Sequence, residues 1–225
     1  MQRQIDIELN ALRSVMLAMG VAVEKAVEAA TSGLIERNAE HLDKVRALED
    51  EINAYHLQVD EKCLKLIASQ SPLAADLRMI LAIIKINADL ERMGDQAMNI
   101  SYNVRDYLTK KELPDAARRI VSMAHAVKKM VRASMEAFIN HDIKLSEQVL
   151  LMDDEVDEGK NSTFKDLVVV MKNDPESVDA AVDLMLVSRN LERLGDHATN
   201  IAEDVIFAST GKDIRHGGFN PGSKT

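Results

Sequence analysis

The sequence is poor in the residues that interrupt helices and in aromatic side chains. It has 4 prolines and 9 glycines in 225 residues, no tryptophan, and only 3% aromatic residues in total. Proline breaks the interior of a helix and glycine weakens it, so their scarcity favours long helices over a sheet or a loop-rich fold. With so few aromatic rings, the core must be filled by aliphatic side chains and by the 12 methionines, which adapt to irregular gaps.

The sequence also argues against an intramolecular disulfide, a membrane-spanning helix and a nucleic-acid partner. Cys63 is the single cysteine, so it has no intramolecular disulfide partner, and its aliphatic neighbours predict a buried side chain. The longest uncharged runs, residues 14–23 and 66–75, are far shorter than the roughly 20 residues that span a bilayer. The net charge of −9 argues against nucleic acid as a partner. We therefore expect a soluble, cytoplasmic protein, and docking on a membrane protein stays open.

Apolar residues recur every three to four positions along almost the whole chain, which is typical of amphipathic helices. Breaks in this pattern fall at Pro72, Pro114 and Pro175. Asn38 and Asp142 are predicted N-caps. The pattern predicts six helices, over residues 5–34, 38–67, 73–108, 116–139, 142–168 and 176–209.

The chain contains an internal duplication. Residues 88–100 (ADLERMGDQAMNI) recur as residues 189–201 (RNLERLGDHATNI), 101 positions later, and the second helix of each copy aligns with an offset of 104. The six helices thus fall into two copies of three, and we predict an all-α fold of two tandem antiparallel three-helix bundles. The expected divisions are residues 1–112 for the first bundle, 113–210 for the second, and 211–225 for a flexible C-terminal tail.

Acidic residues recur on one face of the duplicated helices. Each copy of the repeat places Glu, Asp and Asn at i, i+4 and i+8, and the preceding helix of each copy adds another polar pair at i and i+4. If these helices face each other, they form a first cluster and a second cluster. The first cluster is Glu49, Asn53, Glu91 and Asp95, and the second cluster is Asp153, Asp157, Glu192 and Asp196. Weaker candidates in the same stripes are Asp50, Asn99, Asp154 and Asn200.

Clusters of this kind are candidate metal sites. Hard oxygen donors suit magnesium, manganese, calcium and iron, whereas zinc usually recruits histidine or cysteine as well. We therefore expect divalent or trivalent metal ions as cofactors, with iron, manganese, magnesium and zinc as the candidates.

A plainer interpretation is that the stripes are solvated faces, neutralised by neighbours such as Arg92 and Arg193. Two features favour the site instead: the same acids recur in both copies, and Gly94 and Gly195 lie in helix interiors. Each such glycine costs about 1 kcal/mol relative to alanine, which a close approach of two helices explains.

The sequence offers no catalytic set. The Glu-x-x-His element of di-iron oxidases, a phosphate-cradling glycine-rich loop and a nucleophile elbow are all missing from the sequence. We expect a non-enzymatic adaptor with no catalytic residue. The alternatives are a metal-dependent oxidase or phosphatase built on a helical bundle, and a purely structural helical protein.

Several short motifs resemble the PhoU family of bacterial phosphate-uptake regulators. They are ERMGD at residues 91–95, ERLGD at 192–196, QSP at 70–72, DLR at 76–78 and GKDIRH at 211–216. The likeness covers residues 5–216, although the second copy has Ser-Val-Asp where DLR would be expected. The paired ERxGD segments are the most specific part of the resemblance.

The resemblance implies two three-helix bundles, often dimeric, with metal held by paired acid-x-x-x-Asp motifs that map onto the first and second clusters. Asn53 departs from that motif, so the first cluster is expected to be the smaller. The implied function is negative regulation of the phosphate regulon and of phosphate uptake. The implied partners are the ATPase subunit of the phosphate ABC transporter, the phosphate-sensing histidine kinase and a second copy of the chain, with no nucleic acid and only indirect contact with a membrane.

Overall fold

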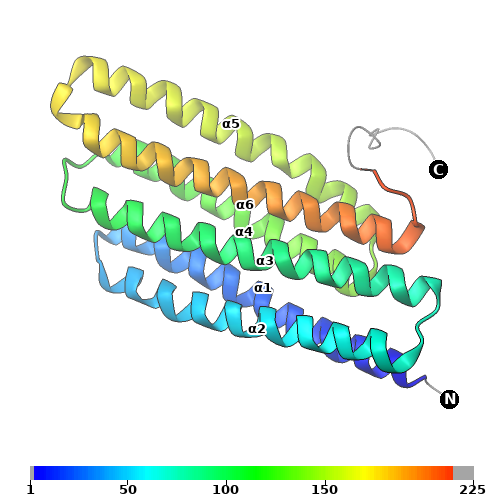
Figure 1. Ribbon diagram of the computed structural model, residues 1–225. Helices are drawn as coiled ribbons and strands as arrows, with labels where there is room; N and C mark the ends of the chain where they lie inside the picture. Colours follow the sequence, from blue (N-terminus) through cyan, green and yellow to red (C-terminus); the bar gives the residue numbers. More distant parts are fainter. Residues whose placement is uncertain (1–2, 215–225) are drawn as a thin grey trace.

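The computed structural model describes residues 3–214 (Figure 1). Over this range the chain forms six long helices, one short 3-10 turn and no strand, so the all-α prediction is confirmed. The helices are α1 (Gln4–Glu36), α2 (Glu40–Gln70), α3 (Ala74–Tyr107), α4 (Pro114–Asn140), α5 (Ile143–Asn173) and α6 (Val178–Thr210). Most of the predicted tail, from residue 215 onward, lies outside the described residues.

The two predicted N-caps have different outcomes. Asp142 is confirmed as the N-cap of α5, since its Oδ1 accepts a hydrogen bond from the backbone N–H of Leu145 at 3.0 Å. The prediction that Asn38 is the N-cap of α2 is wrong by one residue, because Ala39 holds that position. The Asn38 Oδ1 nevertheless accepts from the backbone N–H of Glu40 at 2.9 Å, so it satisfies an otherwise unpaired donor from one position earlier.

The sixth helix begins two residues later than predicted, because Pro175–Ser177 form a separate 3-10 turn. The Asp174 side chain accepts from the backbone N–H of Glu176 at 3.3 Å, and Ser177 Oγ donates to the carbonyl of Asp174 at 2.6 Å. These local hydrogen bonds give the backbone an alternative to the helical pattern, and α6 starts only after them.

The six helices form two bundles that share a core. Helices α1, α2 and α3 contact one another, as do α4, α5 and α6, which confirms the two tandem antiparallel three-helix bundles. The bundles meet where α3 packs on α6 and where α1 packs on α4; in Figure 1, α3 and α6 lie side by side with α1 and α4 behind them. The buried side chains of both bundles belong to one continuous hydrophobic cluster. The division at residue 112 into separate domains stays a prediction.

Methionine and aliphatic side chains fill this core. Met16, Met19, Met93 and Met130 are fully buried, and so is Cys63, as its neighbours predicted. Burial raises the pKa of the Cys63 thiol to about 12. A thiol of that kind carries almost no thiolate at neutral pH, so Cys63 is a packing residue and not a reactive one.

Opposite charges mark the contact between α1 and α4. Lys128 Nζ lies 3.2 Å from Glu28 Oε2, and Arg132 Nε donates to Glu24 Oε2 at 3.1 Å. These two ion pairs join the first bundle to the second with charges of opposite sign.

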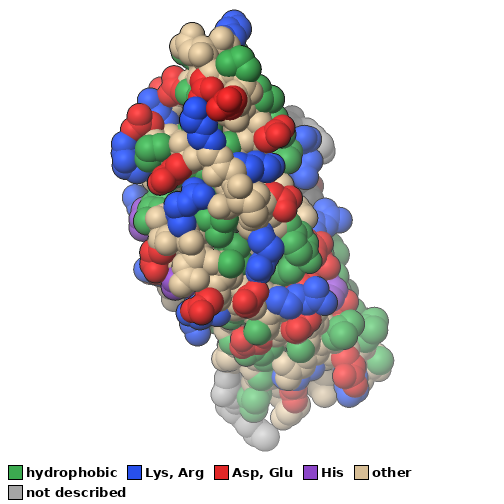
Figure 2. All heavy atoms as spheres, turned by 90° about the vertical axis from the view of Figure 1, so that its left-hand side faces the viewer, with side chains coloured by type: hydrophobic (Ala, Val, Ile, Leu, Met, Phe, Trp, Pro, Cys, Tyr) green, Lys and Arg blue, Asp and Glu red, His purple; other side chains and the backbone are tan. Residues whose placement is uncertain are grey.

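The outer surface mixes charges of both signs. At the end of the molecule seen in Figure 2, the described basic and acidic side chains are interspersed with apolar ones. Among residues 3–214, no helix has an apolar stretch long enough to cross a membrane.

Candidate functional site

The two acid-bearing helices of each bundle pack closely, and the two mid-helix glycines allow it. A Cβ on Gly94 would lie 3.2 Å from Ile52 Cδ1, and a Cβ on Gly195 would lie 3.3 Å from Asp153 Oδ1. Both distances are at the short limit for real side chains, so the prediction that these glycines mark a close approach is confirmed. In the second bundle the approach places a carboxylate of α5 directly against α6.

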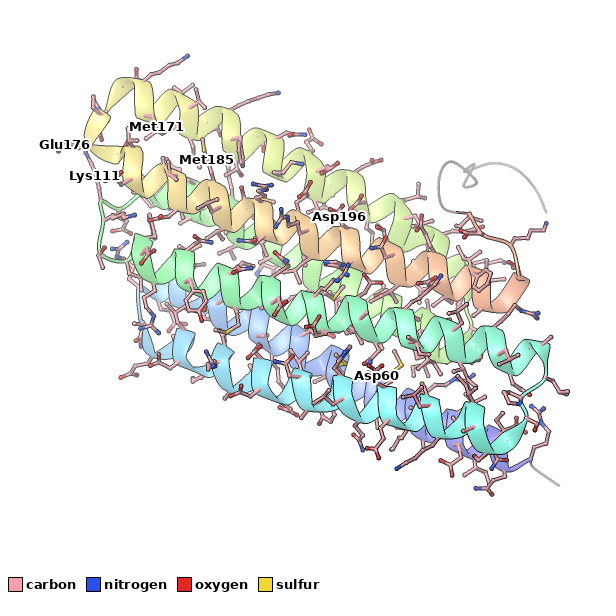
Figure 3. The ribbon with its side chains drawn as sticks, in the orientation of Figure 1. Asp60, Lys111, Met171, Glu176, Met185 and Asp196 are labelled. Carbon is pink, nitrogen blue, oxygen red and sulfur yellow. The ribbon has the colours of Figure 1, made fainter. Side chains whose placement is uncertain are left out.

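A lysine lies inside the second cluster. Lys160 Nζ, on α5, is 2.7 Å from Glu192 Oε1 on α6 and 3.2 Å from Asp157 Oδ1 one turn earlier on its own helix. The Lys160 and Glu192 side chains are 23% and 21% exposed, so the ion pair between them is less screened by water than a pair on the open surface, whereas Asp157 is 53% exposed. Lys160 therefore joins α5 to α6 through two of the four residues of the cluster. Figure 3 labels Asp196, which lies one turn further along α6.

One ammonium group does not neutralise the four carboxylates of the second cluster. Burial, followed by the charge of Asp196 and of other nearby carboxylates, raises the pKa of Asp153 to about 6. Burial and the charge of Glu192 also raise the pKa of Asp196. Both shifts mean that the ionised form is unfavourable in the folded protein. A bound cation would relieve this repulsion, so the electrostatics and the oxygen donors both suit a metal ion.

The first cluster is held together differently. Asn53 Nδ2 donates to Glu49 Oε1 at 2.6 Å, so an amide stands where the second cluster has a carboxylate. Glu49 and Asp95 line one groove of about 350 Å³ between α2 and α3, and Glu91 is half-buried on α3. The other residues of this groove are Arg46, Gln96, Met98, Asn99 and Tyr102. The first cluster is thus more open and carries fewer negative charges.

The four weaker candidates occupy different surroundings. Asn99 lines the groove of the first cluster, whereas Asp50 and Asp154 are exposed. Asn200 Nδ2 donates to Asp89 Oδ1 at 3.3 Å, between the two bundles, where His197 Nδ1 also lies 2.8 Å from the same oxygen. Of these four residues, only Asn99 is therefore placed with the acids of a cluster.

Within residues 3–214, no three Asp, Glu, His or Cys side chains stand where they could hold a metal ion together. Two carboxylates of the second cluster point to Lys160, and Glu49 of the first cluster accepts from Asn53. A metal ion would require these side chains to turn toward it. Metal binding at the two clusters stays a prediction.

Lys160 was not among the residues predicted from the sequence, although the duplication held a signal for it. At the offset of 104, Lys160 corresponds to His56, and at the offset of 101 its partner Glu192 corresponds to Glu91. The spacing of three residues from Asp157 also favours an ion pair on a helix. The signal thus lies in the basic residues of the two copies and not in the acidic ones alone.

Two ion pairs between the bundles, each with a buried carboxylate, were also not predicted from the sequence. Lys85 Nζ on α3 lies 3.1 Å from Asp204 Oδ1 on α6, and Lys110 Nζ lies 2.6 Å from Asp183 Oδ2. The carboxylate side chains are only 5% and 9% exposed. Because a buried charge is costly without its partner, these pairs favour one register of α3 against α6.

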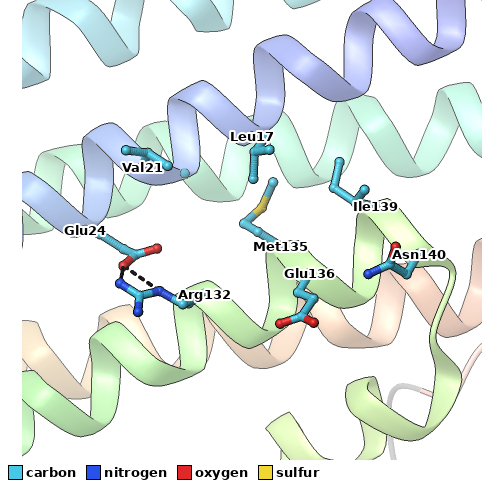
Figure 4. A pocket seen from close by; sticks show the side chains of 9 residues that line it. Leu17, Val21, Glu24, Arg132, Met135, Glu136, Ile139 and Asn140 are labelled. Atoms are coloured by element: carbon cyan, nitrogen blue, oxygen red, sulfur yellow. Dashed lines mark hydrogen bonds and ion pairs between the residues drawn. The ribbon is translucent and has the colours of Figure 1, made fainter.

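A shallow depression between α1 and α4 does not resemble an active site. It measures about 200 Å³, and its wall is mainly apolar, with Leu17, Val21 and Met135 among its residues (Figure 4). At its edge Arg132 pairs with Glu24. None of the residues that line it is a nucleophile with an adjacent base, so it gives no support to an enzymatic function.

Comparison with known proteins gives a consistent result. The family model of the PhoU domain matches the chain twice, at residues 16–104 and 120–205. A phosphate-specific transport system accessory protein PhoU homolog from Pseudomonas aeruginosa is 36% identical over 217 residues, covering 96% of this chain and 90% of the relative. A homolog of the same name from Deinococcus radiodurans is 33% identical and covers 94% of this chain and 99% of the relative. These names describe an accessory protein and not an enzyme.

Solved structures agree with this fold over nearly the whole chain. The crystal structure of PhoU from Pseudomonas aeruginosa has a TM-score of 0.89 and 35% sequence identity, covering 93% of this chain and 100% of that one. The phosphate transport system regulatory protein PhoU from Streptococcus pneumoniae has a TM-score of 0.86 at 25% identity, covering 93% and 99%. Two domain matches, end-to-end relatives and the same six-helix arrangement lead to one conclusion: the chain belongs to the PhoU family.

Proposed function

We propose that this protein is a non-enzymatic accessory protein of the phosphate-specific transport system, which restrains phosphate uptake and keeps the phosphate regulon off when phosphate is plentiful. It works as a homodimeric adaptor on the cytoplasmic side of the inner membrane. There it links the ATPase subunit of the phosphate ABC transporter to the phosphate-sensing histidine kinase. The observation that carries the proposal is that relatives bearing this accessory name align with the chain over almost the full length of both.

We further propose that the first and second clusters each bind a divalent or trivalent metal ion, with iron, manganese, magnesium and zinc as the candidates. Support comes from the hard oxygen donors on facing helices and from the raised pKa of Asp153 in the second cluster. When bound, the ion would neutralise the carboxylates and hold two helices of a bundle together.

Deletion of the gene in the host bacterium tests the regulatory role. Alkaline phosphatase, measured in phosphate-rich medium, is expected to rise in the deletion strain and to return to a low level when the intact gene is restored. Activity that stays low in the deletion strain would contradict the proposed role as a negative regulator.

Metal content tests the two clusters separately. Glu91→Gln with Asp95→Asn is expected to remove the metal of the first cluster, and Glu192→Gln with Asp196→Asn that of the second. The matched control is Glu155→Gln, an exposed acid on α5 outside both clusters. Elemental analysis of the purified proteins reports the loss, and equal metal content in all variants would refute the ligand assignment.

A further inference from the structure

The ammonium group of Lys160 occupies the position of a cation in the second cluster. It lies 2.7 Å from Glu192 on α6 and 3.2 Å from Asp157 on α5, so it contacts carboxylates from both helices that would hold a metal ion. An ammonium group and a metal ion held between the same two carboxylates would lie only a few ångströms apart and would repel each other strongly. The lysine and a metal ion therefore compete for the same two side chains.

The structure also provides space for Lys160 to leave. A groove of about 430 Å³ lies beside it, with Phe164 and Met185 in its wall, and Figure 3 shows Met185 between α5 and α6. The other residues of the groove are Lys160 itself, Val182, Leu186, Arg189 and Glu192. The lysine stem is flexible and apolar, so it can lie along this wall while its charged end turns toward water.

The first cluster has a different residue at this position. His56, the counterpart of Lys160, has its Nε2 3.5 Å from Asp60 Oδ2 and its Nδ1 3.5 Å from the carbonyl oxygen of Asn87. The ring is thus engaged with Asp60 and Asn87, and no contact joins it to Glu91, the counterpart of Glu192, among the described hydrogen bonds and ion pairs. The duplicated sites differ in whether a basic side chain bridges their acids.

We propose that Lys160 is the resident counter-ion of the second cluster, and that a metal ion binds there only by displacing its ammonium group from Glu192 and Asp157. The proposal rests on the metal binding proposed above. The two clusters then differ in metal binding, because a basic side chain competes with the metal ion in the second cluster and not in the first. In the absence of metal, Lys160 holds the acids of α5 and α6 together.

Manganese binding to the purified full-length protein tests the competition. Free Mn²⁺ is measured by electron paramagnetic resonance, in the Glu91→Gln/Asp95→Asn background, so that the second cluster is observed alone. Lys160→Met keeps the length of the stem and removes the charge, and it is expected to tighten Mn²⁺ binding by about tenfold or more. The control Lys165→Met, on the exposed side of α5, is expected to change nothing.

The reciprocal substitution tests the same idea in the first cluster. His56→Lys, in the Glu192→Gln/Asp196→Asn background, is expected to weaken Mn²⁺ binding by about tenfold. Lys160→Met that binds Mn²⁺ no more tightly than the protein with Lys160 would overturn the proposal while leaving the metal sites intact. No Mn²⁺ binding in any variant would instead refute the proposed metal sites, and the competition with them.

Stability without metal gives a second readout. In excess chelator, Lys160→Met is expected to melt at a lower temperature than Lys165→Met, because the acids of the second cluster then lack their counter-ion. Added Mn²⁺ is expected to restore more stability to Lys160→Met than to the unchanged protein. Equal melting temperatures of the two lysine variants in chelator would show that Lys160 is not the counter-ion.

Discussion

Replacing Asp153 by asparagine tests how unfavourable the second cluster is in the absence of metal. Asp153 lies on α5 against the backbone of α6, with its Oδ1 3.3 Å from the position of a Cβ on Gly195. Burial and the neighbouring carboxylates raise its pKa from 3.8 to about 6. Asparagine has nearly the same shape and no charge, so the substitution removes the repulsion with little change in packing.

The sign of the effect follows from the two pKa values of Asp153. Between about pH 4 and pH 6 the folded protein holds a proton that the unfolded chain has already released. The associated stability is complete below about pH 4 and is lost as the pH rises through about 6. At pH 7.5 the folded protein therefore carries the full cost of ionising Asp153, whereas the Asp153→Asn variant carries none.

The size of the effect follows from the same shift in the Asp153 pKa. A shift of about 2 units corresponds to about 3 kcal/mol. Because Asp153 is only half-buried, solvent screening reduces this to about 1–2 kcal/mol. For a chain of this length, the melting temperature of Asp153→Asn at pH 7.5 is then expected to rise by about 3–6 °C.

The assay is urea unfolding of the metal-free protein at pH 4.0 and pH 7.5. Asp153→Asn is expected to be more stable than the unchanged protein at pH 7.5 and equal to it at pH 4.0. Glu155→Gln, at an exposed position of α5 outside both clusters, is the control for a general loss of negative charge. If Asp153→Asn were no more stable at pH 7.5, or if Glu155→Gln stabilised equally, the reasoning from burial and repulsion would be refuted.

Three further predictions concern the scaffold and are measured by urea unfolding at pH 7.5. Gly33→Ala would place a Cβ 2.5 Å from Leu42 Cδ2, so it is expected to cost about 1–3 kcal/mol despite the helix preference of alanine; a gain in stability would contradict this. Lys85→Met leaves the buried Asp204 carboxylate without that partner and is expected to cost about 2 kcal/mol of stability. Adding Asp204→Asn is expected to recover part of this loss. If the stability losses of the two substitutions simply added in the double variant, Lys85 and Asp204 would not interact. Asp142→Ala removes the N-cap of α5 and is expected to cost about 1 kcal/mol, so an unchanged midpoint would count against that cap.

Most of the helical scaffold could be predicted from sequence patterns within a few residues of each other. Helical periodicity and the prolines predicted the six helices, and Asp142 was found because capping depends on residues only three positions apart. The small errors have the same local origin. Asn38 caps α2 from one residue outside the expected position, and Asp174 and Ser177 hold a 3-10 turn where a helix was expected.

The glycine positions were enough to predict which faces of the duplicated helices come close, because a glycine such as Gly94 or Gly195 in a helix interior is explained by a contact that excludes a side chain. Which charged groups meet depends on how the helices pack in three dimensions. Lys85 and Asp204 are 119 positions apart, and Lys160 reaches Glu192 on a different helix. Such pairs depend on the rotation and register of each helix to within a few ångströms, and the pKa of Asp153 depends on the whole set at once. Periodicity in the chain places a carboxylate on a face, but it does not determine what lies opposite.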